Sequence, residues 1–275
     1  MKPSIHHLWW NPFQDIELDF PINVSISIDT MKCDENADLK ILFMAEPPSI
    51  CPDFNDRAVL EGGKFDKIYS FNYMVLGMHK LNAEMFEWGS TWLDIPNLKF
   101  EKEPIMTFVT SSKSDADGHK LRLQIYDYLE TIDYAGDLEI FQHKSPPFHQ
   151  TRNDFFNNAM FHIAVENSMT YNYFTEKLID CFASRTIPIY YGCLNIGDWF
   201  DTRGIIQFSD LDELKYILDN ITTDEYARRL LYVEENFNRA KEFYGENDVV
   251  PRITRKIKEY VNASVCGEPK QLDQV

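Results

Sequence analysis

The sequence predicts an α/β protein built from two Rossmann-like lobes, and two observations lead to this prediction. From about residue 100 onward, apolar segments of strand length alternate with segments of helix length, a pattern typical of parallel βαβ units. Before residue 100, short apolar strands are separated by irregular connections. The 275 residues, 44% of them apolar, suffice for two modest hydrophobic cores. We therefore expect an N-terminal lobe over residues 1–100, a C-terminal lobe over residues 101–262 and a tail over residues 263–275.

Three strands are expected in the N-terminal lobe. Residues 23–29 (NVSISID) alternate between apolar and polar side chains, which predicts a strand with one face in solvent. Residues 39–45 (LKILFMA) are typical of a buried strand that the following prolines terminate, and residues 67–71 (KIYSF) are the third candidate. Two aromatic groups near turns either pack in the core or form a surface on which sugar rings stack. These groups are Trp9, Trp10 and Phe13, and Trp88 and Trp92.

In the C-terminal lobe, strand and helix candidates follow one another along the chain. Strands are expected at residues 105–111, 137–141, 161–166, 187–191 and 205–208. Helices are expected at residues 119–131, 154–158, 175–184, 210–220, 223–244 and 251–261. Because ligands of parallel sheets bind where loops leave the carboxyl ends of strands, the loops after Ser111 and Glu166 are the expected ligand positions.

The charge and the cysteines restrict the class of protein. A net charge of −17 makes the chain a poor general binder of nucleic acid or anionic membranes, and its simplest role is solubility. Any phosphorylated ligand would need a few local cations and helix ends. The five scattered cysteines form no C-x-x-C pair, so we expect reduced, mostly buried thiols. With no signal-like start and no apolar run of about 18 residues, we expect a soluble cytoplasmic protein.

The segment after residue 161 carries the strongest functional signal. A strand ends at Glu166 and Asn167, a polar loop follows, and Thr175, Glu176 and Lys177 open the next helix. Thr175 suits the cap and Glu176 suits the helix N-terminus, where free N–H groups make an anion site. Lys177 opposes the helix dipole in that turn, which an anion nearby would relieve. The alternative is an ordinary surface lysine.

Two further residues admit both a functional and a structural interpretation. Arg122 lies near the start of a helix and could clamp a diphosphate with its guanidinium. Alternatively, it is an exposed helix arginine that pairs with Asp127 or Glu130. Glu46 directly follows a buried strand, so it is either a general base with a raised pKa or a solvated turn residue before Pro47.

The sequence offers little support for a metal site. Asp115 and Asp117 form a D-x-D motif, but they lie in a polar loop where Asp and Gly are ordinary turn formers. The pair His6 and His7 is weak. We therefore expect no metal and no cofactor.

Several segments, in the same order along the chain, resemble the α-1,3/1,4-fucosyltransferases of glycosyltransferase family ten. ENS (166–168) followed by YFTEK (173–177) is similar to the family pattern F-E-N-S/T … Y-V/I-T-E-K. IPIYYG (187–192) resembles V/I-P-I/V-Y-x-G, and RLQIYDYL (122–129) resembles R-N-x-x-Y-x-x-L. LFMAEPP (42–48) resembles a family strand that ends in Gly-Glu-Asn. The resemblance is strong over about residues 105–210 and weaker before them.

This resemblance implies a GT-B type fold with the donor site in the cleft on the C-terminal lobe. It implies an inverting transfer of fucose from GDP-fucose to a hydroxyl group of an oligosaccharide acceptor, without a metal. Arg122 and Lys177 would hold the diphosphate and stabilise the departing GDP. The nucleotide site would be lined by Asn167, Tyr173 and Glu176, the last of which suits the ribose hydroxyls.

The same resemblance implies two carboxylates for the transfer step. Glu46 would be the general base that takes the proton from the acceptor hydroxyl. Glu166 would position the fucose or stabilise positive charge on it, and is the rival base. The family's Gly-Glu-Asn is here Ala45, Glu46 and Pro47, which makes the base less secure than the donor site. The alternatives are the same fold with another GDP-sugar, or an inactive carbohydrate-binding relative.

Overall fold

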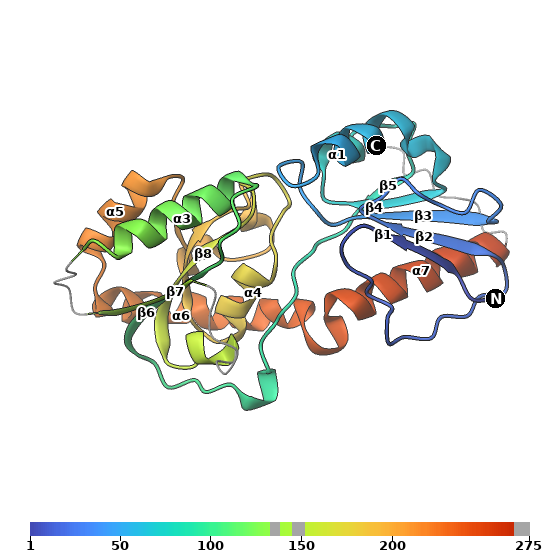
Figure 1. The fold of residues 1–275 in the computed structure, drawn as a ribbon. Coiled ribbons are helices and arrows are strands. Elements are labelled where there is room, and N and C mark those ends of the chain that lie inside the picture. The colour runs from blue at the N-terminus through green and yellow to red at the C-terminus, as the bar shows by residue number, and fades with distance from the viewer. Residues whose placement is uncertain (133–137, 145–151, 267–275) are drawn as a thin grey trace. The chain divides into compact units, whose positions relative to one another are not determined.

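The computed structural model describes residues 1–132, 138–144 and 152–266. The chain divides into two compact units, and we describe each by itself. Unit 1 comprises Met1–Trp88 and Asp248–Val275, and unit 2 comprises Gly89–Asn247. Each unit contains a five-stranded sheet whose neighbouring strands are all parallel (Figure 1). The predicted α/β class is therefore confirmed.

The sheet of unit 1 follows the order of the chain. Its strands are β1 (Ser4–His7), β2 (Val24–Ile28), β3 (Leu39–Met44), β4 (Lys67–Ser70) and β5 (Ala83–Met85). Its helices are α1 (Pro52–Glu61), α2 (Tyr73–Leu76) and α7 (Val249–Cys266). The three predicted strands of this region are confirmed as β2, β3 and β4, whereas β1, β5, α1 and α2 were not anticipated from the pattern.

The two faces of this sheet are covered by different helices. On one face, Leu42 and Met44 of β3 pack with Phe54 and Ala58 of α1. On the other face lies α7, as Figure 1 shows, and the Tyr69 hydroxyl of β4 donates a hydrogen bond to a carbonyl of this helix at 3.3 Å. Both faces are thus buried, which is typical of parallel sheets.

The prediction of a solvent face on β2 is wrong. All five residues of this strand are buried, including Ser25 and Ser27. Ser25 Oγ accepts a hydrogen bond from the Asp34 N–H at 2.9 Å, and Ser27 Oγ donates to the Lys32 carbonyl at 2.6 Å. The alternation of the sequence therefore reflects small polar side chains that are satisfied inside the unit, not a face in water.

The sheet of unit 2 has the order β10-β9-β8-β6-β7. Its strands are β6 (Glu103–Thr110), β7 (Glu139–Lys144), β8 (Ala159–Val165), β9 (Ile187–Tyr191) and β10 (Ile206–Gln207). Its helices are α3 (Asp117–Leu129), α4 (Glu176–Ala183), α5 (Leu211–Asn220) and α6 (Thr223–Ala240). Leu121 and Ile125 of α3 share one core cluster with Leu214 of α5, whereas Leu178 and Phe182 of α4 belong to a second cluster.

Three expectations about the C-terminal half differ from the structure. The helix expected at residues 154–158 is only a 3₁₀ turn (Arg152–Phe155), because the Asn153 side chain hydrogen-bonds both backbone groups of Asp94 and the chain enters β8 soon after. The last helix belongs to unit 1 rather than to the C-terminal lobe. It also continues to Cys266, past the expected start of the tail, and the rest of that tail lies outside the described residues.

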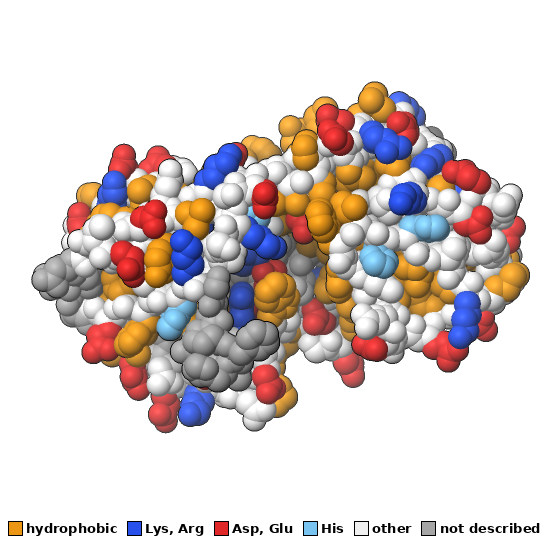
Figure 2. Space-filling view, viewed as in Figure 1, with side chains coloured by type: hydrophobic (Ala, Val, Ile, Leu, Met, Phe, Trp, Pro, Cys, Tyr) orange, Lys and Arg blue, Asp and Glu red, His pale blue; other side chains and the backbone are white. Residues whose placement is uncertain are grey.

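The surface and the cysteines can be compared with the composition. Figure 2 shows Asp and Glu side chains scattered over the visible face, with Lys and Arg side chains between them. Cys51, Cys181 and Cys193 are buried, Cys33 is partly buried and Cys266 is exposed, and all five are free thiols. Within the described ranges, no helix combines the length and the apolar character needed to cross a membrane.

Candidate nucleotide-binding site

Unit 2 has a topological switch point between β6 and β8. From β6 the chain runs through α3 to β7 at one edge, whereas from β8 it runs through α4 to β9 on the opposite side. Because these connections diverge, the carboxyl ends of the two neighbouring strands form the position at which such sheets bind ligands. The start of α3 and the residues that follow β8 meet here, since the Gly118 N–H donates to the Asn167 carbonyl at 3.1 Å.

Gly118 makes this close approach possible. A β-carbon built on Gly118 would lie 1.8 Å from the Glu166 carbonyl oxygen and 2.9 Å from the Asn167 carbonyl carbon. Both are backbone atoms, which cannot move aside as a flexible side chain can. The first turn of α3 therefore touches the chain after β8 without any side chain between them.

Arg122 is buried and holds the end of β8. Its Nε and Nη2 donate to the Val165 carbonyl at 2.9 and 2.6 Å, and Nη2 also donates to Asn167 Oδ1 at 2.8 Å. Burial lowers the pKa of this guanidinium from its usual range. The alternative of an exposed arginine paired with Asp127 or Glu130 is wrong, because 8% of Arg122 is accessible and its partners lie across the switch point.

Glu166 is fully buried and closes the loop that follows β8. The Thr175 N–H donates to its Oε1 at 2.8 Å, and the Thr175 hydroxyl donates to its Oε2 at 2.7 Å. Burial raises the pKa of Glu166, and the nearby Lys177 opposes that rise. A carboxylate with no accessible surface cannot touch an acceptor in this conformation, so the geometry does not favour Glu166 as the base.

Lys177 lies between two carboxylates at the start of α4. Its Nζ is 2.7 Å from Glu176 Oε1 and 3.8 Å from Glu166 Oε2. Thr175 caps the helix by accepting the Lys177 N–H at 3.4 Å. Burial raises the pKa of Glu176, but Lys177 and Arg152 outweigh it and leave that pKa below its usual value. Two carboxylates thus offset the unfavourable position of Lys177 in the helix dipole.

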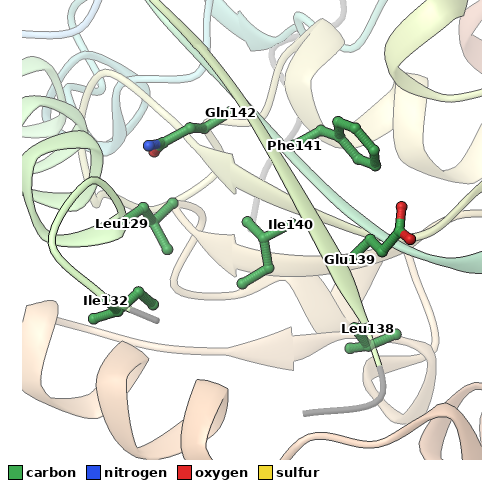
Figure 3. A pocket seen from close by; sticks show the side chains of 7 residues that line it. All are labelled: Leu129, Ile132, Leu138, Glu139, Ile140, Phe141 and Gln142. Atoms are coloured by element: carbon green, nitrogen blue, oxygen red, sulfur yellow. The ribbon is translucent and has the colours of Figure 1, made fainter. Parts of the chain in front are cut away.

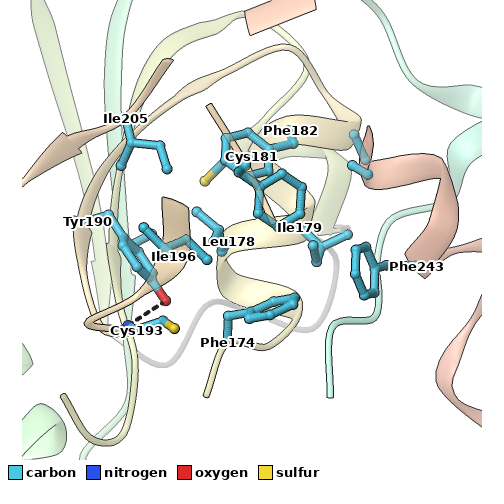
Figure 4. Close-up of a cluster of buried hydrophobic side chains, with 14 of the residues drawn as sticks. Phe174, Leu178, Ile179, Cys181, Phe182, Tyr190, Cys193, Ile196, Ile205 and Phe243 are labelled. Carbon is cyan, nitrogen blue, oxygen red and sulfur yellow. Dashed lines mark hydrogen bonds between the residues drawn. The ribbon is translucent and has the colours of Figure 1, made fainter. Parts of the chain in front are cut away.

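The remaining residues of this segment are anchored in the core. Tyr173 is buried, and Phe174 packs against Trp199, Phe200 and Phe243 at ring distances of 5.2 to 5.7 Å. Figure 4 shows the apolar side of α4 in the same cluster, in which the Tyr190 hydroxyl accepts the Cys193 N–H at 3.0 Å. The polar residues at the start of α4 therefore adjoin a buried cluster rich in aromatic side chains.

Six residues gather at the switch point, and we call them the switch-point cluster. They are Arg122, Glu166, Asn167, Thr175, Glu176 and Lys177. All the predicted nucleotide-site residues lie in this cluster or, in the case of Tyr173, in the loop that enters it. The role of each residue stays a prediction.

A second ion pair, which was not expected from the sequence, joins Arg152 and Asp180. Arg152 Nε donates to Asp180 Oδ2 at 3.0 Å, and its guanidinium lies 5.0 Å from the Trp92 ring centroid. Asp180 is fully buried and also accepts the Thr91 hydroxyl at 2.7 Å and the Trp92 N–H at 3.0 Å. Burial raises the pKa of Asp180 to about 6, although Arg152 opposes this. The sequence signal that could have indicated this pair is the acidic residue Asp180 among the buried residues of α4.

Glu46 lies in unit 1, two residues after the end of β3, and is half-buried. Asp29, at the end of the neighbouring β2, accepts the N–H groups of Ala45 and Glu46 with its Oδ1 at 2.7 and 3.1 Å. Burial raises the pKa of Asp29 to about 7. From the sequence, Asp29 was expected only as the end of a strand. Its φ of 50° places it in the left-handed region, which Asp and Asn tolerate better than most residues.

The structure separates the aromatic residues into two classes. Phe13 and Trp88 are buried and serve the core. Trp9, Trp10 and Trp92 are exposed, with 69%, 41% and 64% of their surface accessible. Core packing is therefore right for the first two, and a surface for sugar stacking stays a prediction for Trp9, Trp10 and Trp92.

Neither the D-x-D motif nor the pocket in Figure 3 contributes a residue to the switch-point cluster. Asp117 pairs with Lys120 at 3.3 Å, and the described part of the chain contains no group of three or more potential ligand side chains placed to hold a metal. The pocket in Figure 3 lies beside the edge strand β7 and contains none of the predicted site residues. Its lining consists of Leu129, Ile132, Leu138, Glu139, Ile140, Phe141 and Gln142.

Most of the C-terminal half of the chain matches a known protein family. Residues 100–268 match the C-terminal domain of glycosyltransferase family 10 (fucosyltransferase). Over 121 residues the chain is 26% identical to alpha-(1,3)-fucosyltransferase FucT of Helicobacter pylori, a match that covers 44% of this chain and 25% of that enzyme. The chain thus spans about a quarter of the length of that relative.

Two solved structures can be compared with the fold. A crystal structure of alpha1,3-fucosyltransferase is similar with a TM-score of 0.52 at 16% identity, over 84% of this chain and 81% of that one. A structure of alpha1,3-fucosyltransferase with GDP-fucose has a TM-score of 0.49 at 14% identity, over 100% and 91% of the two chains. The first of these confirms the predicted GT-B type fold. Because the family match spans more than half of the chain, the protein belongs to glycosyltransferase family 10, the fucosyltransferase family.

Proposed function

We propose that this protein is an inverting glycosyltransferase that moves fucose from GDP-fucose to a hydroxyl group of a glycan acceptor. The observation that carries the proposal is the switch-point cluster, which gathers two cations and a helix N-terminus at the ligand-binding edge of a parallel sheet. The names of the similar proteins, alpha-(1,3)-fucosyltransferase FucT and alpha1,3-fucosyltransferase, support fucose as the transferred sugar.

In this proposal the diphosphate of the donor binds between Arg122 and Lys177. The hydrogen bonds of Arg122 to β8 and Asn167 use Nε and Nη2, so Nη1 can serve the phosphate without disturbing them. Lys177 Nζ and the N–H groups of the first turn of α4 add positive potential. Glu176 suits the ribose hydroxyls, and Asn167 and Tyr173 complete the nucleotide site.

The transfer step then needs one base and stabilisation of the leaving group. Glu46 takes the proton from the acceptor hydroxyl while the oxygen attacks the anomeric carbon from the side opposite GDP, which inverts the configuration. Negative charge grows on the departing diphosphate, and Arg122 and Lys177 stabilise it at that moment. These two cations take the role that a metal ion has in other transferases.

A thermal-shift panel tests the donor site first. The panel contains GDP, GDP-fucose, UDP, ADP and CMP, each with and without EDTA. A ligand at ~100 times its Kd stabilises the folded state by roughly 2.7 kcal/mol, which moves the melting temperature visibly. We expect a shift with GDP and GDP-fucose that EDTA leaves unchanged. A shift with UDP, or none with guanine nucleotides, would contradict the proposal.

The Glu46→Gln variant tests the base. Gln keeps the size of the side chain but cannot accept a proton, so we expect GDP affinity to remain and transfer to be lost. The readouts are calorimetric GDP binding and GDP release from GDP-fucose in the presence of an oligosaccharide panel. If transfer survives in this variant, Glu46 is not the base.

A further inference from the structure

A buried polar network surrounds Glu46 in unit 1. Asp29, Asn55, Ser70 and Asn72 are all at least nine-tenths buried. They come from four different places: the ends of β2 and β4, helix α1, and the residue that precedes α2. Buried polar side chains are costly unless their hydrogen bonds are satisfied, so their convergence on one short segment calls for a physical reason.

The network forms hydrogen bonds with both backbone groups of Glu46, its N–H and its carbonyl. On the amino side, Asp29 Oδ1 accepts the N–H groups of Ala45 and Glu46 at 2.7 and 3.1 Å. On the carboxyl side, Asn55 Nδ2 donates to the Glu46 carbonyl at 3.3 Å and to the Cys51 carbonyl at 2.9 Å. The peptide units before and after Glu46 are therefore both fixed by buried side chains.

The Asn55 side chain is itself fixed from the next strand. Asn72 Nδ2 donates to Asn55 Oδ1 at 2.9 Å, the Ser70 hydroxyl accepts the Asn72 N–H at 3.0 Å, and Asn72 Oδ1 accepts the Met74 N–H at 2.9 Å. Each amide side chain is thus used as both donor and acceptor, which fixes its orientation. The chain of contacts runs across the carboxyl ends of three strands, at the edge where such sheets carry their functional groups.

We propose that Asp29 and Asn55 are positioning residues that hold the Glu46 carboxylate in place for proton transfer. The proposal rests on the proposed function, in which Glu46 is the base. Neither residue needs to touch a substrate, because both act through the backbone of Glu46. Displacing a catalytic group by about 1 Å costs on the order of 100-fold in rate. Hydrogen bonds that fix both peptide units of Glu46 should therefore affect the rate of transfer.

The main test compares Asp29→Ala with Asp29→Asn and with a matched control. Ala removes the acceptor, whereas Asn keeps an oxygen that can accept both N–H groups. Asp66→Ala is the control, because Asp66 Oδ2 accepts the Lys40 N–H at 2.9 Å near the other end of the same strand, β3. Turnover is measured as GDP release from GDP-fucose, with an oligosaccharide panel and with water alone as acceptor, and GDP affinity is measured by calorimetry.

We expect Asp29→Ala to lower kcat by about 10- to 100-fold with unchanged GDP affinity, and Asp29→Asn to restore most of the rate. Asp66→Ala should stay within about twofold of the wild-type kcat. An equal loss in Asp66→Ala, or wild-type turnover in Asp29→Ala, would overturn the proposal, because the effect would then be general weakening of the sheet or no effect.

A double-mutant cycle separates this proposal from the assignment of the base. If Asp29 acts through Glu46, Asp29→Ala should cost nothing further once Glu46→Gln has removed the base. An equal loss in both backgrounds would refute the positioning role while the base assignment stands. Wild-type transfer in Glu46→Gln alone would instead refute the base assignment, and the positioning proposal with it.

Discussion

Replacing Lys177 by Met removes the cation that two buried carboxylates share. Glu166 has no accessible side-chain surface and Glu176 has 10%, and Lys177 Nζ is 3.8 and 2.7 Å from their oxygens. Met keeps most of the apolar stem of the lysine but removes the ammonium group that lies 2.7 Å from Glu176 and 3.8 Å from Glu166, and leaves only the more distant charge of Arg152 to act on Glu176. The perturbation therefore tests whether Lys177 stabilises the free protein as well as binding a donor.

The expected magnitude follows from the burial of the pair. Removing one partner of a buried ion pair typically costs about 3–5 kcal/mol, since the other charge is left uncompensated. For a unit of this size, 1 kcal/mol corresponds to roughly 2–4 °C in Tm, so the unfolding transition of unit 2 should fall by roughly 6–20 °C at pH 7.5. The exposed pair of Lys120 and Asp117, at 3.3 Å, should be worth at most about 1 kcal/mol.

The pH dependence of this loss has a definite sign. The pKa of Glu176 is lowered in the folded protein, so its stabilising contribution is present above the ordinary value of 4.5 and is lost as the pH falls. Without Lys177, which opposes the rise that burial causes in the pKa of Glu166, that pKa rises further, and Glu166 takes up a proton at a higher pH than in the wild type. The difference in Tm between Lys177→Met and the wild type should therefore be largest near pH 7.5 and shrink toward pH 5.

Calorimetry or circular dichroism at pH 5 and 7.5 measures this difference, with Lys120→Met as the matched control. Lys120 also lies in the first two turns of a helix, but on the surface. A fall of less than about 2 °C in Lys177→Met at pH 7.5, or an equal fall in the control, would refute the reasoning. Lys177 would then contribute nothing to the stability of the two acids.

Three further predictions concern the switch point and the buried network around Glu46. Gly118→Ala should destabilise the protein by about 1–3 kcal/mol or more in urea unfolding, because the added β-carbon would lie 1.8 Å from the Glu166 carbonyl oxygen. Gly63→Ala is the control and should be neutral, because its β-carbon would meet no atom within 4 Å. Arg122→Ala should weaken GDP binding by about 10- to 100-fold in calorimetry, the value of a charged hydrogen bond, and unaltered affinity would contradict its phosphate role. The pKa of Asp29 is about 7 in the folded protein, above its ordinary value of 3.8. The stability of the wild type relative to Asp29→Asn should therefore fall as the pH rises from about 4 to 7. A stability difference that does not change with pH would exclude this titration.

Much of the fold could be predicted because local patterns determine it. The apolar segments at Leu39–Met44 and Ile187–Tyr191 are too short for helices, and both form central strands. The solvent face expected of β2 was wrong because Ser25 and Ser27 are small enough to be buried and find backbone partners. Alternation alone does not distinguish such a strand from one that is half exposed.

The site could be predicted only as far as its residues are close in sequence. The segment from Glu166 to Lys177 is one loop and helix start, so its polar residues were expected to act together. The bonds of Arg122 to β8 span 43 residues, and no local pattern indicates whether an arginine on a helix points to solvent or to a neighbouring strand. The hydrogen bond that Asp29 accepts from the Glu46 N–H likewise depends on which strands pair, and the sequence does not reveal that pairing.

The division of the chain has a consequence for how the molecule can be made and dissected. Unit 2 is one uninterrupted segment, whereas unit 1 is assembled from both ends of the chain, with α7 closing one face of its sheet. On the ribosome, which releases the N-terminal part first, all of unit 2 emerges before unit 1 receives its last helix. Until then the stacked rings of Phe43 and Tyr69, 4.8 Å apart, lack their covering helix. Residues 89–247 are therefore the natural fragment to express alone, while unit 1 requires a linker that joins Trp88 to Asp248.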